Sequence, residues 1–444
     1  MVKISVIMPS LNVAKYIKKC MDSVVNQTMK DIEIIVVDAG SVDGTEEIIR
    51  SYAERDARVR FIHSDKKSYG YQVNVGLSMA AGEYVGIVET DDWIEPDTYE
   101  VLYQYARKYE ADYVRGMSQL YKETDGGLSY GLCFSVFPQK LYEDNHGVIW
   151  VNPQEQKDIL RNDAFLWNGI YNRNFLRGIK LNETAGASYQ DVGFLVQVYD
   201  KAVRAVYVDK LIYHYRKDND DCSCYSRNAF RYLAEEYRFV QQFFEREDKG
   251  WKLFSDAKYF QQIYTRFRLM AQTGSYWEEA VPYIEEMQEY FQGRQDVLPA
   301  LGESYREGFV SFLETPRKLY EALEKENTAK QETWNAFLDT LRERKIIIFG
   351  SGKRGYFLQF LLYKKRVGHV LGYCDNDLSK TGQVLYGLKV KTLEEWRQAS
   401  DIGDICYVIT ARAYAEEIEK QLLLSGIAEE NIVLFDLPMD FSAL

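Results

Sequence analysis

The sequence predicts an α/β protein with a doubly wound sheet in its N-terminal half, a helical region after it and a smaller α/β domain at the C-terminal end. Strand and helix patterns alternate over about the first 115 residues, helical patterns alone fill 226–340, and strand patterns return at 345. Strands that alternate with helices are typical of a sheet covered by helices on both faces. We therefore expect three domains, at 1–225, 226–340 and 341–444.

The strands and helices of the N-terminal half follow one another in regular order. A helix over 13–27 has its apolar residues on one stripe, and Asp43 and Glu46 have capping-box spacing at the start of another. Ligands of such sheets bind beyond the carboxyl ends of the strands, so the residues after each strand are candidates for a site. The expected strands are 4–8, 32–37, 59–63, 83–88 and 111–116.

Composition narrows the function classes. With 46% hydrophobic and 27% charged residues the 444-residue chain resembles ordinary globular proteins, and its net charge of -12 disfavours nucleic acid as a partner. No apolar run approaches the ~20 residues that span a bilayer, and the start MVKISVIMPSLN lacks the features of a signal peptide. We expect a cytoplasmic protein, with peripheral attachment at the inner face of the cell membrane as an alternative.

Short polar segments follow three of the expected strands. Each alone is ordinary turn chemistry, and a lone Asp38 is more often a turn or helix-cap residue than a ligand. Three such segments at one sheet edge favour a binding site. The segments are PSLN with Pro9 and Asn12, VVDAGSVDGT with Asp38 and Gly40, and ETDD with Glu89, Asp91 and Asp92.

The segment ETDD carries three carboxylates within four positions, directly after a strand that is expected to be buried. Carboxylates at that spacing repel one another, and leaving water costs each of them several kcal/mol unless it is paired. Mn²⁺ or Mg²⁺ relieves the repulsion, because these cations prefer carboxylate and phosphate oxygens as ligands. We therefore predict a divalent metal at this segment, with a solvated acidic loop as the alternative.

The order of these motifs resembles that of inverting family 2 glycosyltransferases with the GT-A fold. The resemblance covers about residues 3–225 and is carried by ISVIMPSLN, IEIIVVDAGSVDGT, GYQVNVGLSMAAGEYVGIVETDDW and ETAGASYQDVGF. It implies a GT-A type mixed sheet and transfer of a sugar from a UDP-sugar, with inversion, to a hydroxyl. The acceptor would be a glycan, lipid-linked sugar or glycoprotein in surface polysaccharide or glycoconjugate biosynthesis.

The resemblance also implies roles for individual residues of the donor side. Asp38 would bond the uracil ring, flanked by the turn from Pro9 to Asn12, and the last carboxylates of ETDD would bind the metal. Val73 stands where the family frequently has Arg, so Tyr69 and Asn74, with Lys66 and Lys67, are the remaining candidates in that stretch.

Inversion requires a carboxylate that removes the acceptor hydroxyl's proton on the face opposite the leaving group. The resembled family uses the Asp of an ED pair before a helix, and SYQDVGFLVQVY supplies Asp191 with Gln190 in place of Glu. We predict Asp191 as the base and Gln190 as a neutral neighbour on the acceptor side. The structural alternative for Asp191 is an N-cap of that helix.

Two further segments match the family. WNGIYNRNFL (167–176) matches the acceptor-side segment, where Trp167 is predicted to face a sugar ring, with a core position as the alternative. YHYRKDNDDCSCYS (213–226) resembles the segment that closes over the donor. His214 is predicted there as a ligand of the metal or diphosphate, with a structural role as the alternative, and Arg216 as a donor contact.

The C-terminal domain carries GSGKRG, with Gly350, Gly352 and Gly355, and Asp375 follows 20 residues after Gly355. This is the spacing of a dinucleotide-binding turn. The residues that remain are too few for a full dehydrogenase, and the domain resembles Rossmann-like modules appended to bacterial polysaccharide-biosynthesis enzymes. We retain these four residues as a candidate second nucleotide site.

Two readings from other classes stay open. One is a non-catalytic nucleotide-binding scaffold of a glycosyltransferase complex, and the other is a nucleotide sensor or oxidoreductase acting through the C-terminal domain. The helical region 226–340 is predicted to be a connector or an oligomerisation module, through which the chain would form a homo-oligomer.

Overall fold

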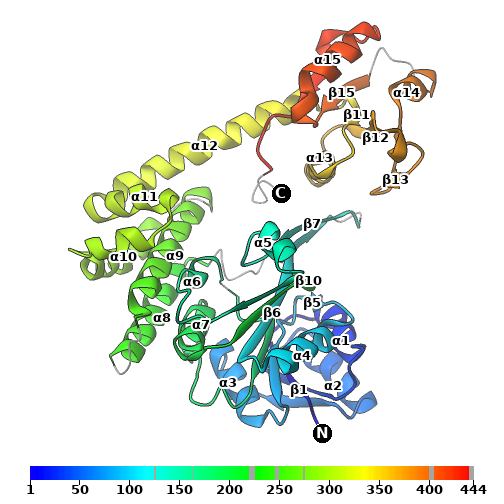
Figure 1. The fold of residues 1–444 in the computed structure, drawn as a ribbon. Helices are drawn as coiled ribbons and strands as arrows, with labels where there is room; N and C mark the ends of the chain where they lie inside the picture. The colour runs from blue at the N-terminus through cyan, green and yellow to red at the C-terminus, as the bar shows by residue number, and fades with distance from the viewer. Residues whose placement is uncertain are drawn as a thin grey trace. The chain divides into compact units, whose positions relative to one another are not determined.

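The computed structural model describes residues 1–124, 127–163, 165–219, 226–245, 250–273, 276–399 and 405–439. It confirms the predicted fold class, because it contains a large mixed sheet, a helical region and a second, smaller sheet (Figure 1). The chain divides into two compact units, one of residues 1–120 and 133–325 and the other of residues 121–132 and 326–444.

The sheet of the first unit has the strand order β3-β2-β1-β4-β9-β6-β10-β5, with β7 and β8 beside this path. β1 pairs in parallel with β2 and β4, whereas β9 runs antiparallel to β4 and β6. The strands are β1 (Ile4–Ser10), β2 (Ile32–Asp38), β3 (Val59–His63), β4 (Tyr84–Ile87), β5 (Trp93–Ile94), β6 (Tyr113–Glu123), β7 (Ser129–Phe134), β8 (Val148–Val151), β9 (Gly169–Asn172) and β10 (Ala205–Arg216).

Helices lie along this sheet and bury one apolar face each. The predicted stripe of the first helix is confirmed, since Ile17, Cys20, Met21 and Val24 are its buried residues. The helices of the sheet region are α1 (Ile17–Val25), α2 (Thr45–Arg55), α3 (Tyr69–Met79), α4 (Thr98–Tyr109), α5 (Gln139–Asp144), α6 (Ile159–Asn162) and α7 (Gln190–Lys201).

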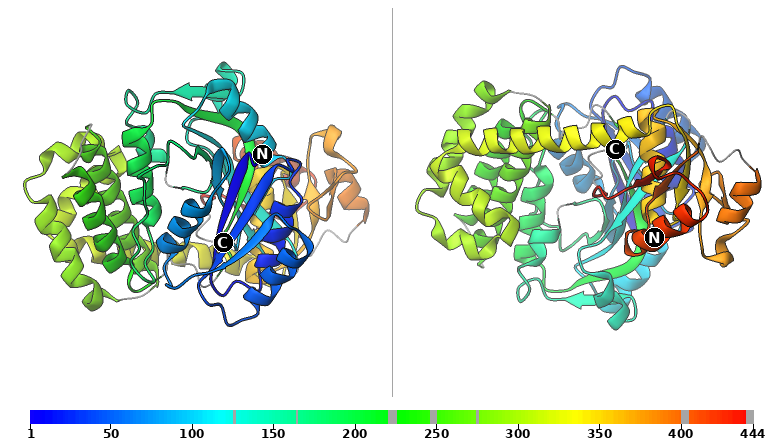
Figure 2. Two further views of the ribbon diagram at one scale, coloured as in Figure 1. Left: turned by 90° about the horizontal axis from the view of Figure 1, so that it is seen from below. Right: turned by 90° about the horizontal axis from the view of Figure 1, so that it is seen from above.

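The helical region packs on α7, as Figures 1 and 2 show. Nearly every side chain of α7 is buried, because the helix lies between the sheet and α8. Residues 226–325 belong to the same compact unit as the sheet, and the division into three domains stays a prediction. The elements are α8 (Ala229–Phe244), α9 (Lys252–Thr273), α10 (Trp277–Phe291), the 3-10 helix η2 (Gln295–Ala300), α11 (Glu303–Glu314) and α12 (Pro316–Thr340).

The second unit contains a six-stranded sheet of order β13-β14-β12-β11-β15-β16. Residues 121–132 join this unit, and the Tyr130 ring contacts the rings of Tyr356, Phe357 and Phe360. Its elements are β11 (Lys345–Phe349), α13 (Lys353–Lys365), β12 (His369–Cys374), η3 (Leu378–Lys380), β13 (Val384–Leu385), β14 (Leu388–Lys391), α14 (Leu393–Ala399), β15 (Ile405–Ile409), η5 (Arg412–Tyr414), α15 (Ala415–Leu424), η6 (Glu429–Asn431) and β16 (Ile432–Leu434).

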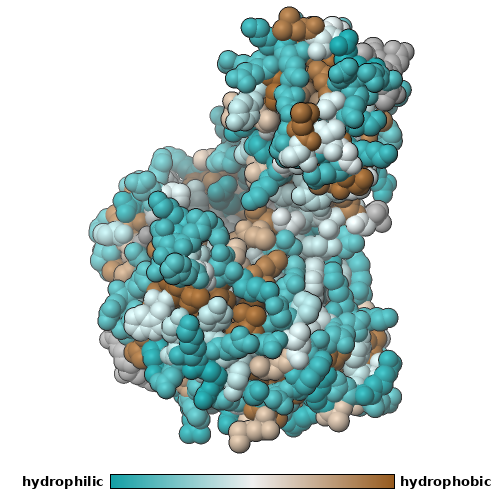
Figure 3. Space-filling model, turned by 45° about the vertical axis from the view of Figure 1, so that its right-hand side comes forward, coloured by the Kyte–Doolittle hydropathy of each residue, from teal (hydrophilic) through white to brown (hydrophobic). Residues whose placement is uncertain are grey.

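The face shown in Figure 3 is mostly hydrophilic, with apolar residues singly or in small groups. Among the described helices, none combines the length and the apolar character that crossing a membrane requires.

Candidate active site

The carboxyl ends of the central strands bring the predicted segments together. Ser10, at the end of β1, pairs in register with Asp38 at the end of β2. The Thr90 hydroxyl donates to the Pro9 carbonyl at 2.9 Å, and the Gln72 amide donates to the Ser10 and Val37 carbonyls. These contacts fix the ends of β1, β2 and β4 to one another at one edge of the sheet.

The Asp38 carboxylate accepts hydrogen bonds from the turn that follows it. Its Oδ2 accepts from the backbone N–H groups of Gly40 (3.0 Å) and Ser41 (2.8 Å), and its Oδ1 accepts from the Ser41 hydroxyl. The residue is fully buried. Asn12 ties the neighbouring turn to this one, because its Oδ1 accepts from the Val42 N–H at 2.9 Å. The geometry is that of the turn alternative rather than of a carboxylate open to a ligand.

The three acids of ETDD have different partners. The Tyr69 hydroxyl donates to Glu89 Oε1 at 2.6 Å, and burial raises the pKa of Glu89 to about 8. Asp92 is 1% exposed and accepts from the Tyr213 hydroxyl and the Arg216 backbone N–H, each at 2.7 Å, while burial raises its pKa well above the ordinary range. Glu89 and Asp92 are thus held by the protein itself.

Asp91 is the remaining acid of this group and is partly exposed. One carboxylate oxygen, Oδ2, accepts from the Asn219 amide at 2.8 Å, and its backbone carbonyl accepts from Arg216 Nε at 3.0 Å. Within the described ranges, no group of three or more His, Cys, Asp or Glu side chains is arranged to hold a metal ion. Of the four predicted ligands, Glu89 and Asp91 are partly exposed and Asp92 and His214 are buried, and the assignment of a divalent cation to them stays a prediction.

His214 shares β10 with Arg216 and pairs in register with Trp93, the residue after Asp92. Its two ring nitrogens bond Glu95 Oε1 (2.5 Å) and Gln119 Oε1 (3.0 Å), and its ring stacks on Trp93 at 4.7 Å. Burial lowers the pKa of His214, against the opposing effect of Glu95. Since both nitrogens have protein partners, the structural alternative describes His214. Residues 220–225 of the predicted closing segment lie outside the described residues.

Asp191 lies in the first turn of α7 and is partly exposed. Its Oδ1 accepts from the Val192 N–H at 3.0 Å, and the N-cap position belongs to Tyr189. Burial raises the pKa of Asp191 to about 6, although the charges of Lys258 and Arg266 oppose this. The charge of Asp191 also raises the pKa of Glu89, so these two acids lie within electrostatic range of one another.

Three other predicted residues take part in the protein's own packing. Trp167 is 6% exposed, and its ring stacks on those of Tyr213 (4.0 Å) and Phe165 (4.6 Å). Gln190 is 2% exposed and donates to the Ala187 carbonyl. Asn74 exchanges two hydrogen bonds with the Leu181 backbone. Trp167 therefore occupies the core position that was its alternative, because its indole fills the space beside the tyrosine that holds Asp92.

Sequence reasoning missed the contribution of the helical region to this site. Lys258 and Arg266 of α9 and Glu236 of α8 are buried and act electrostatically on Asp191 or are acted on by it. Burial lowers the pKa of Lys258 to about 8. These residues lie 45 to 75 positions after Asp191, and no local motif marks them. A buried charge inside a helical pattern was the one available signal.

In the candidate second nucleotide site, the carboxylate of Asp375 is hydrogen-bonded to neighbouring residues of the same unit. Asp375 Oδ2 accepts from the Ser351 N–H at 3.0 Å and from Lys380 Nζ at 3.2 Å. Gly355 is required by the turn, since a Cβ there would lie 2.1 Å from the Gly350 carbonyl oxygen, whereas Gly352 has open space at the start of α13. The acid that would contact a ribose is thus paired with its own glycine turn.

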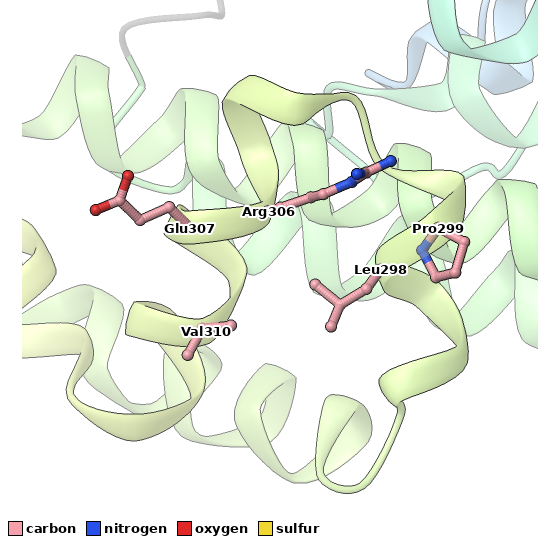
Figure 4. A pocket seen from close by; sticks show the side chains of 5 residues that line it. All are labelled: Leu298, Pro299, Arg306, Glu307 and Val310. Carbon is pink, nitrogen blue, oxygen red and sulfur yellow. The ribbon is translucent and has the colours of Figure 1, made fainter.

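A hollow of about 490 Å³ lies in the helical region, between η2 and α11 (Figure 4). Its lining residues are Leu298, Pro299, Arg306, Glu307 and Val310. Only one carboxylate lines it, and in the close view the Glu307 side chain points away from Arg306. The hollow offers no counterpart to the acids at the sheet edge.

Comparison with known proteins finds relatives of the first part of the chain. Residues 5–165 match the family model described as glycosyl transferase family 2. Glycosyltransferase GlyA of Streptococcus pneumoniae is 34% identical over 48% of this chain and 30% of its own length, and the uncharacterized glycosyltransferase EpsJ of Bacillus subtilis is 31% identical over 48% and 61%. This chain therefore covers less than two thirds of the length of either relative.

Solved structures extend the likeness to the fold. S. aureus TarS 1-349 in complex with UDP-GlcNAc has a TM-score of 0.54 at 19% identity, over 74% of this chain and 92% of that one. Residues 5–165 thus match the family 2 model, and the fold of this chain is similar to that of TarS 1-349.

Proposed function

We propose that this protein is a glycosyltransferase that moves a sugar from a UDP-sugar to a hydroxyl of a glycan, lipid-linked or glycoprotein acceptor, with inversion. The observation that carries the proposal is Asp191. It is a partly exposed carboxylate with a raised pKa, within electrostatic range of Glu89, in a chain of which residues 5–165 match the family 2 model. Acids with perturbed pKa values that gather at one sheet edge are typical of catalytic sites.

The donor diphosphate is proposed to lie at Asp91 and Arg216. Asp91 has a partly exposed carboxylate, and Arg216 places its guanidinium beside the Asp91 backbone. Mn²⁺ or Mg²⁺ held by Asp91 would supply charge neutralisation of the departing diphosphate. Asp92, next to Asp91, accepts a hydrogen bond from the Tyr213 hydroxyl. Glu89 accepts one from the Tyr69 hydroxyl, and its pKa of about 8 means that it binds a proton near neutral pH.

The nucleoside is proposed to lie over the ends of β1 and β2. The Ser10 hydroxyl there is buried and has no hydrogen-bond partner among the described residues. A buried hydroxyl without a partner costs free energy, so a bound ligand that pairs with it gains affinity. Ser10 is therefore added to the predicted donor contacts beside Pro9 and Asn12.

Asp191 is proposed as the general base. With a pKa of about 6 it is mostly ionised at neutral pH, and the N-terminal turn of α7 favours the anion. Its carboxylate accepts the proton of the acceptor hydroxyl as the hydroxyl oxygen attacks the anomeric carbon. The leaving nucleotide departs on the opposite face, and the configuration inverts.

The bound ligand of TarS makes UDP-GlcNAc the first donor to test. Release of UDP from UDP-GlcNAc and other UDP-sugars is measured with Mn²⁺ or Mg²⁺, and again with EDTA, in the presence and absence of glycan and lipid-linked acceptors. We expect metal-dependent release of UDP that a suitable acceptor accelerates. A folded protein that neither binds UDP nor turns over any UDP-sugar would contradict the proposal.

A further inference from the structure

The first turn of α7 is held from outside by helix α8. Glu236 Oε1 accepts from the backbone N–H of Gly193 at 3.0 Å, and Glu236 is 1% exposed. The approach is so close that a Cβ on Gly193 would lie 2.1 Å from that oxygen. A carboxyl from α8 thus satisfies a backbone donor that a helix terminus leaves free.

The residue before this turn is held by α9. Arg266 Nη1 donates to the Tyr189 hydroxyl at 2.9 Å, and the guanidinium carbon lies 5.2 Å from the centre of the Tyr189 ring. Tyr189 has a left-handed backbone with φ of 77°, which is uncommon for a residue with a Cβ. The helical region therefore grips the chain on both sides of Asp191, at Tyr189 and at Gly193.

Glu236 also brings a second carboxyl to the turn that carries the proposed base. Gln190, directly before Asp191, is neutral and buried against the Ala187 carbonyl. The charge of Asp191 acts on Glu236 and, after burial, contributes to the raised pKa of Glu236, which is about 8. Position 190, where the resembled family has Glu, carries Gln in this chain, and Glu236 of α8 brings a carboxyl to the same turn instead.

We propose that Glu236 is a positioning residue that fixes the first turn of α7, so that the Asp191 carboxylate points at the acceptor hydroxyl. The inference rests on the proposed function, in which Asp191 is the base. It makes the helical region a working part of the transferase site in addition to any role as a connector. A shift of about 1 Å in a reacting group costs on the order of 100-fold in rate, so loosening this turn lowers the rate of transfer and not the binding of the donor.

The test compares Glu236→Leu, Glu236→Gln and Gly193→Ala with the wild type. Glu235→Gln is the matched control, because it makes the same side-chain substitution at the neighbouring position of α8, where Glu235 pairs with Arg231. For each protein, kcat and the donor KM are measured, together with amide hydrogen exchange over residues 190–193. Glu236→Gln keeps an oxygen that accepts from the Gly193 N–H.

We expect Glu236→Leu and Gly193→Ala to lower kcat by about 100-fold with an unchanged donor KM, and to speed exchange in the first turn of α7. Glu236→Gln restores most of the rate, and Glu235→Gln matches the wild type. Wild-type kcat in folded Gly193→Ala or Glu236→Leu would overturn the proposal. If the wild type turns over no donor, the proposed function fails; hydrogen exchange then decides separately, and unchanged protection in both variants overturns the positioning role.

Discussion

The two sheets of this protein share one sequence feature, an acid at the end of a parallel strand, but differ in the acids that lie near it. In each, an acid lies at the carboxyl end of a parallel strand beside a glycine-containing turn: Asp38 is the last residue of β2, and Asp375 directly follows β12. Both carboxylates accept from backbone N–H groups of these turns, Asp38 from Gly40 and Asp375 from Ser351. In both cases the acid at the strand end stabilises the adjacent turn by accepting hydrogen bonds from it.

The difference lies in what else stands at the edge. Asp91 follows β4 of the first sheet, and Asp191 of α7 lies within electrostatic range of Glu89; both acids are partly exposed, and burial raises the pKa of Asp191 to about 6. In the second sheet burial is outweighed by hydrogen bonds from Ser351 and Lys380, which lower the pKa of Asp375. A carboxylate that its own turn satisfies has little left to offer a ligand, so the comparison favours the proposal that the chemistry takes place at the first sheet.

The largest expected effect is that of Asp191→Asn. Loss of a general base typically costs 10²–10⁴-fold in rate, so we expect kcat to fall by about that factor. UDP binding stays unchanged, because Asp191 does not hold the donor in this account. Steady-state UDP release and a UDP titration measure the two quantities. Asp375→Asn is the control, and equal losses in both variants would remove the contrast between the sheets.

The next largest effect is a difference in unfolding free energy between variants of the two neighbouring acids of ETDD, Asp91 and Asp92. Asp92→Ala leaves the Tyr213 hydroxyl and the Arg216 N–H buried without their acceptor, which costs roughly 2–5 kcal/mol of unfolding free energy. Asp91→Ala removes one partly exposed acceptor and costs about 1 kcal/mol or less. Urea unfolding followed by tryptophan fluorescence measures both. Equal losses of stability would mean that Asp92 is no more structural than Asp91.

A smaller effect is the pH dependence of transfer. The base works when ionised, so kcat/KM is expected to fall as pH drops through about 6, by up to tenfold per pH unit. The raised pKa means that the folded state binds this proton more tightly than the unfolded state does. Its contribution to stability is full below the unfolded pKa and is lost as pH rises through about 6, so this group does not unfold the protein in acid. A profile that is flat from pH 5 to 8 would argue against Asp191 as the base.

Most of the fold was predictable from sequence, because apolar periodicity marks β1, β2 and the stripe of α1 directly. Several candidate residues were also found at the sheet edge, because strand ends converge in such folds. The hydrogen-bond partners of the candidate side chains could not be predicted. Whether Asn74 or His214 faces a ligand or another segment of the chain depends on residues far away in sequence, such as Leu181 and Glu95. The contact of Glu236 with Gly193 of α7 and that of Arg266 with Tyr189 could not be predicted for the same reason.

The measurement that tests the central claim most directly is a calorimetric titration of UDP with Mn²⁺ into the wild type, Asp91→Asn and Asp375→Asn, each repeated with EDTA. The account predicts metal-dependent binding that Asp91→Asn abolishes and Asp375→Asn leaves intact. Undiminished binding by Asp91→Asn, or loss of binding in Asp375→Asn, would contradict the placement of the donor at the first sheet.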